Sequence, residues 1–160
     1  MRYPAVFKPD GERGMALLVS LVFLLVLSLI GLSSLQNATL QEKMAASLLL
    51  HNRAFQAAEA ALRLGEGAVR RGDDSLPLCA DPVRCAPPAE STVVSGAGFN
   101  EASAVTWVAT GEGFYAVQNL GIVRNALGLP PDTSATLYRV TAVGLAGQAR
   151  SVLESIYAKY

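Results

Sequence analysis

The sequence has 160 residues, enough for one domain with an appendage, and its 13 basic and 13 acidic side chains give a formal net charge of zero. Zero net charge argues against a nucleic-acid-binding protein, which normally carries a basic surface, and an apolar share of 51% excludes a disordered polar chain. Two cysteines and one histidine cannot complete a four-ligand Cys/His zinc site. Neither a G-x-x-x-x-G-K-[ST] loop nor an H-E-x-x-H motif occurs. We therefore expect no enzyme, and we assign no catalytic, cofactor-binding or metal-binding residue.

The first distinctive feature is a long apolar run near the N-terminus. No charged residue occurs from Met15 to Gln41, and the stretch Met15–Leu35 is interrupted only by serines and one glycine. About 20 apolar residues suffice to span a bilayer as a helix, so this run predicts a transmembrane helix. The charged residues ahead of it are Arg2, Lys8, Asp10, Glu12 and Arg13. Basic residues before a first apolar span predict that this end stays in the cytoplasm.

Three interpretations of this N-terminus are open. A removed secretory signal needs a shorter apolar core and a small-residue cleavage site after it, and SSLQNA is a poor version of that site. An uncleaved membrane anchor is the simplest alternative. The third interpretation places a cleavage between Gly14 and Met15, so that residues 1–14 are a leader and the apolar helix becomes the mature N-terminus. The abrupt border from a charged leader to an unbroken apolar run favours this third interpretation.

The helix is predicted to continue beyond the apolar run. Residues 15–40 form its transmembrane half, and residues 41–72, which contain no proline, form an amphipathic half. Arg70 and Arg71 followed by Gly72 are typical of a helix C-terminus. A helix from Met15 to Arg71 is roughly 85 Å long, so its first half must lie in lipid or pack against other chains. An apolar stripe is expected at Leu40, Met44, Leu48, Phe55, Ala58, Leu62, Gly65 and Val69.

A loop follows the helix. Residues 73–102 contain four prolines together with acidic, Ser and Gly residues, which predicts a long surface loop. Cys79 and Cys85 lie within it, in the sequence CADPVRC. A compartment beyond the membrane is oxidising, so a disulfide is the natural interpretation. Because a redox-active pair usually has C-x-x-C spacing, we favour a structural role over a catalytic one.

Residues 103–160 are predicted to form a sheet. Segments rich in Val, Thr, Tyr and Ile alternate with glycine-rich connections. We expect three or four antiparallel strands and no helix after Gly72. One face of such a sheet needs cover, and the helix stripe around Phe55, Leu62 and Val69 is the long element available to provide it. The fold class is therefore predicted to be α+β, with the back half of one long helix packed on a small antiparallel meander.

These features together resemble the type IV pilins and the related pseudopilins. The stretch from Gly14 to Arg63, which contains GMALLVSLVFLLVLSLIGLSSLQNATLQEKMAA and NRAFQAAEAALR, is similar to the PilX group of minor pilins. The resemblance implies that a prepilin peptidase cuts after Gly14 and methylates the new amine of Met15. It further implies an inner-membrane protein with a cytoplasmic leader and a periplasmic domain. An assembly platform then moves the subunit into a pilus, where the apolar helix halves form the core.

Val19 departs from the family pattern. Most pilins carry Glu at the fifth residue of the mature chain, where it is thought to pair with the terminal amine of the preceding subunit, and that position is Val19 here. Met15 replaces the usual Phe as a milder departure. Because a tip subunit has no predecessor, we hypothesise a minor pilin at or near the tip that helps initiate assembly. The expected partners are other minor pilins, the major pilin and a PilY-type tip adhesin.

Two alternatives stay open. A type II secretion pseudopilin has the same architecture in a different machine, and only the PilX-like stretch speaks against it. A membrane-anchored periplasmic binding module belongs to a different class, and it would need a pocket with convergent polar groups that the sequence does not suggest. Cell adhesion, twitching motility and DNA uptake all remain possible roles for the pilus.

Overall fold

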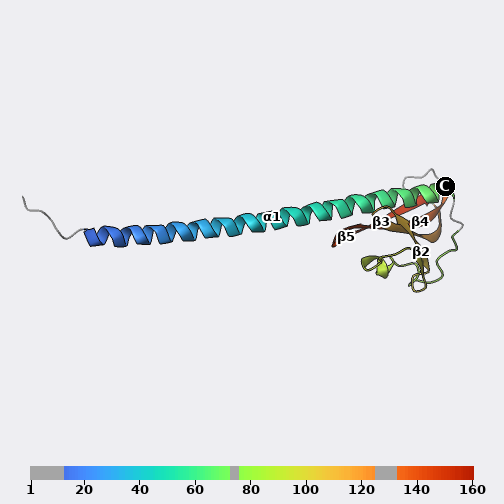
Figure 1. Ribbon diagram of the computed structural model, residues 1–160. Coiled ribbons are helices and arrows are strands. Elements are labelled where there is room, and N and C mark those ends of the chain that lie inside the picture. Colours follow the sequence, from blue (N-terminus) through green and yellow to red (C-terminus); the bar gives the residue numbers. More distant parts are fainter. Residues whose placement is uncertain (1–12, 73–75, 125–132) are drawn as a thin grey trace, which may run out of the picture. The chain divides into compact units, whose positions relative to one another are not determined.

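The computed structural model describes residues 13–72, 76–124 and 133–160. The described residues contain one long helix, a short 3₁₀ helix and five strands. Figure 1 labels the helix α1 and the strands β2, β3, β4 and β5. The chain divides after Ala45 into two compact units, and the second unit contains the sheet. The elements are α1 (Arg13–Arg71), η1 (Ala89–Thr92), β1 (Gly98–Asn100), β2 (Val105–Thr110), β3 (Gly113–Arg124), β4 (Ser134–Ala146) and β5 (Ala149–Lys159).

The first unit is the apolar part of α1. No proline interrupts it, and three of its hydroxyl side chains, those of Ser20, Ser28 and Thr39, donate to backbone carbonyls of the same helix. Ser20 donates to the carbonyl of Leu17 at 2.8 Å, and Ser28 donates to the carbonyl of Leu24 at 2.8 Å. The helix is long and apolar enough to cross a membrane, and its apolar side chains are exposed. An exposed helix that is apolar all round needs lipid or other helices around it.

The C-terminus of α1 forms as the sequence predicts. Arg70 and Arg71 occupy the last turn, and Gly72 adopts a left-handed conformation with φ of 81°. Its amide donates to the carbonyls of Ala68 and Val69, both at 3.2 Å, which satisfies two groups that the helix end leaves unpaired. Lys159 from β5 also donates to the Val69 carbonyl at 3.0 Å. The end of the helix is therefore tied to the end of the sheet.

The strands form one antiparallel meander in the order β1-β2-β3-β4-β5. This confirms the predicted α+β fold class, but the details differ from expectation. The sheet has five strands rather than three or four, because β1 lies inside the segment expected to be loop. The 3₁₀ helix η1 also lies in that segment, so the expectation of no helix after Gly72 is wrong.

Helix α1 covers one face of the sheet with small side chains rather than large ones. Phe55, expected at the centre of the packing stripe, is 49% exposed. Gly144 of β4 explains the difference, because a side chain there would overlap the helix backbone at Ala54 and Ala58. The close approach of helix and strand leaves no room for large residues between them. The buried residues on the sheet-facing side of the helix are Ala54, Ala58, Ala61, Gly65, Ala68 and Val69.

The core lies on both faces of the sheet. On the helix side, Val69 packs with Val117 and Val140. On the opposite side, Trp107 packs with Ala116 and Val143, and η1 contacts β4 and β5 there. Burying each such valine contributes about 1.5–3 kcal/mol. The sheet is therefore a middle layer between α1 and the segment that follows it.

Candidate functional site

Two features are candidates for function, the start of the exposed apolar helix and the disulfide-bearing loop. They belong to different units of the chain, so each is described by itself. Among the described residues, no group of three or more His, Cys, Asp and Glu side chains could hold a metal ion. The single histidine, His51, is exposed on α1.

At the start of α1, Met15, Val19 and Phe23 lie one helical turn apart and share one side of the helix. The side chain of Val19 is about half exposed and has only apolar and small neighbours. The sequence has no charged residue between Gly14 and Glu42 that could pair with a charge placed at position 19. A carboxylate at this position would therefore find no charged side chain to pair with among residues 14–41.

Gly14 lies one residue ahead of Met15 within the same helix. A Cβ atom built on Gly14 would meet no atom within 4 Å. The packing of the described chain therefore does not require glycine at this position.

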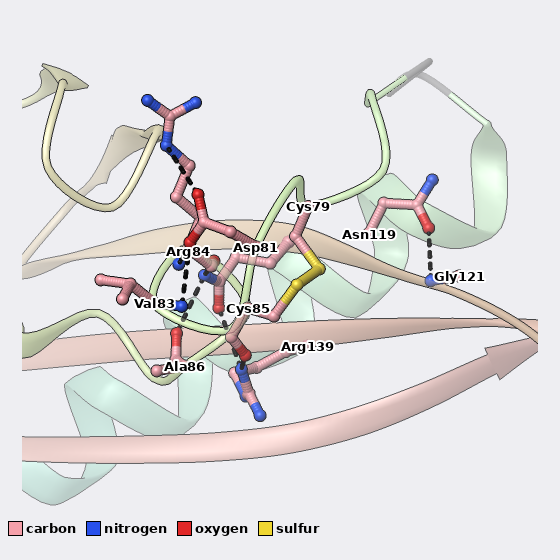
Figure 2. The surroundings of a disulfide bond; sticks show 10 residues. Cys79, Asp81, Val83, Arg84, Cys85, Ala86, Asn119, Gly121 and Arg139 are labelled. Atoms are coloured by element: carbon pink, nitrogen blue, oxygen red, sulfur yellow. Dashed lines mark hydrogen bonds and ion pairs between the residues drawn. A yellow bond between two sulfur atoms is a disulfide. The ribbon is translucent and has the colours of Figure 1, made fainter.

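The disulfide joins Cys79 and Cys85, with a Cα–Cα distance of 5.2 Å (Figure 2). The turn between them is closed a second time by Asp81. The Asp81 carboxylate accepts hydrogen bonds from the amides of Val83 and Arg84, both at 2.9 Å, and its carbonyl accepts one from the amide of Cys85 at 2.9 Å. Asp81 thus forms an Asx turn, which holds the loop backbone independently of the disulfide bond.

The C-terminal end of the loop is bound to the sheet by two side chains. Gln118 of β3 donates to the carbonyls of Arg84 and Ala86 at 2.6 and 3.0 Å. Arg139 of β4 donates to the Cys85 carbonyl (Figure 2). It also donates to the side-chain oxygen of Gln118. These bonds satisfy loop carbonyls that would otherwise be unpaired beside the sheet.

Arg139 is itself held in place by an ion pair. Its Nε atom lies 3.0 Å from Oε1 of Glu154 on β5, and its side chain is only 14% exposed. A guanidinium this buried requires a compensating charge. Arg139 therefore links the disulfide loop to both β4 and β5.

The N-terminal end of the loop is bound to β3. The amide of Cys79 donates to the carbonyl of Asn119 at 3.0 Å, and the Asn119 side chain donates to the carbonyl of Leu76 at 2.9 Å. A bulge between Asn119 and Gly121 produces this geometry, and Gly121 takes a φ of 98° that favours glycine. The loop is thus attached at both ends, and its exposed tip consists of Ala80, Asp81, Pro82, Val83 and Arg84.

The later part of the same segment is attached through Glu90 of η1. Its carboxylate accepts hydrogen bonds from the Ser103 hydroxyl and from the Trp107 indole, the latter at 3.2 Å. Arg150 of β5 donates to the carbonyl of Ser91 at 3.1 Å. Sequence reasoning assigned no role to Glu90, Arg139 or Arg150. Only the positions of Arg139 and Arg150 within strand-like segments hinted that they were available to bind the loop.

Of the residues singled out from the sequence, the structure brings Cys79 and Cys85 together as a disulfide. Gly14, Met15 and Val19 share the first turns of α1. The loop assigned to residues 73–102 is more ordered than expected where it is described, because it contains η1 and β1. Residues 1–12 of the expected leader lie outside the described residues.

Comparison with known proteins gives one family. Residues 13–63 match the family model described as PilX N-terminal. No curated protein and no solved structure matches the chain. The matched segment covers the apolar part of α1 and continues into the part that packs on the sheet. Residues 13–63 are therefore similar to a PilX N-terminal domain, and this similarity supports a PilX-type minor pilin of the type IV pilin family.

Proposed function

We propose that this chain is a minor pilin that helps to initiate type IV pilus assembly and lies at or near the pilus tip. Its partners are other minor pilins, the major pilin and a PilY-type tip adhesin. Valine at position 19 is the observation that carries this proposal. The protein acts as a structural subunit, without a reaction of its own.

The argument from Val19 is electrostatic. A carboxylate among packed apolar helices is costly unless a cation pairs with it. In a subunit within the filament body, the terminal amine of the neighbouring subunit supplies that cation. The first subunit has no such neighbour, and an apolar side chain at position 19 removes the need for one. Val19 thus suits a subunit that begins a filament.

The rest of the chain is consistent with the steps by which a pilin reaches the pilus tip, namely membrane insertion, processing and entry into the filament. The exposed apolar half of α1 first resides in the inner membrane and then packs with other helices in the filament core. We propose that a prepilin peptidase removes residues 1–14 and methylates Met15. Residues 15–40 then form the span and filament core, and residues 41–72 form the half that carries the sheet. Residues 73–102 form the disulfide-bearing segment, which also contains β1, and residues 103–160 contain the other four strands.

A pseudopilin of a type II secretion system is the second candidate. The PilX N-terminal match favours the pilus over the secretion system. The two are separated by the phenotype of a deletion strain. Loss of surface pili with normal secretion supports a pilus role, and loss of secretion with normal pili supports the pseudopilin.

The position of the protein is tested by quantitative mass spectrometry and immunogold labelling of sheared pili. A tip subunit should be present in a few copies per filament, and label should lie at filament ends. The deletion strain should carry fewer pili than the wild type, and those pili should still consist of the same major pilin. Label distributed along the whole filament would overturn the tip position.

A further inference from the structure

We draw no further inference here: the strongest candidate, the open and mostly apolar groove between α1 and the β2–β3 turn, which is lined by Arg53, Ala57, Ala60, Leu64, Gly111 and Glu112, carries none because nothing in the structure shows what covers it.

Discussion

Gly144 of β4 lies directly against the backbone of α1 at Ala58, and a single added methyl group at position 144 would overlap the helix. The same contact explains why alanines line the sheet-facing side of the helix between Ala54 and Ala68. Close packing of backbone on backbone excludes large side chains from the interface. We therefore expect a larger side chain at this contact to destabilise the packing of the helix on the sheet.

Gly144→Ala should destabilise the second unit by about 1–3 kcal/mol, the usual cost of overpacking a core. The buried indole of Trp107, the sole tryptophan, provides a fluorescence signal for denaturant unfolding of the full chain in detergent. Gly111→Ala is the matched control, because a Cβ there meets no atom within 4 Å. Equal unfolding midpoints for the two variants would contradict the close contact at Gly144.

The sequence predicted the elements better than their contacts. Residue periodicity and the Arg70-Arg71-Gly72 signal located α1 and its end, since both depend on local chemistry. The expected burial of Phe55 is wrong because burial depends on how closely β4 approaches the helix, and that approach is set by Gly144, far away in sequence. Periodicity identifies an apolar stripe, but it does not measure the distance between two elements.

The loop was predictable only in part, for the same reason. The disulfide follows from the two cysteines and their compartment, whereas the residues that bind the loop lie far from it in sequence. Arg139 is 54 residues from Cys85, and Trp107 is 17 residues from Glu90. The strand β1 has only three residues, Gly98–Asn100. This is too short for an alternation of apolar and polar residues to be recognised in the sequence.

Gly14→Leu should leave a full-length, unmethylated precursor in the inner membrane. A peptidase that cuts beside the membrane must approach the backbone closely, and glycine leaves that approach open. Gly31→Leu is the control, because both glycines have open space around them in the helix and only Gly14 borders the expected cleavage. Intact-mass and peptide analysis should find methylated Met15 in the wild type and in Gly31→Leu. A mature N-terminus elsewhere would sink the processing proposal.

Replacing Cys79 and Cys85 together with serine should loosen the loop while the sheet stays folded. The bonds from Asp81, Gln118 and Asn119 remain, and closing so short a loop contributes at most about 2–3 kcal/mol. Hydrogen exchange should therefore increase at residues 80–86 and stay unchanged in β4. Thiol titration of the wild type before reduction serves as the control, and two free thiols would reopen a redox role for the pair.

Arg139→Met should destabilise the domain by about 1–3 kcal/mol, because it leaves the Cys85 carbonyl and Glu154 without their partner. Arg63→Met is the matched control, since the Arg63 side chain is 74% exposed and pairs with Glu59 on the same helix, where a change of a few tenths of a kcal/mol is expected. Combining Arg139→Met with the double serine variant should give a non-additive effect, since both changes act on the same loop. Strict additivity would show that Arg139 does not hold the loop.

Val19→Glu is expected to impair the start of assembly. The variant places a carboxylate on an apolar stretch of helix that has no charged residue of its own as far as Gln41. A tip subunit meets no neighbouring amine above it, so the charge stays unpaired at a cost of a few kcal/mol at mid-membrane depth and less near the interface. We expect fewer pili per cell, counted by electron microscopy, with no increase of this protein in sheared filaments. Val19→Gln introduces a side chain with the shape of glutamate but without its charge, so its number of pili per cell should be closer to that of the wild type. If Val19→Glu instead enters filaments in greater amount while pilus number is unchanged, position 19 belongs to a body subunit and the tip position fails.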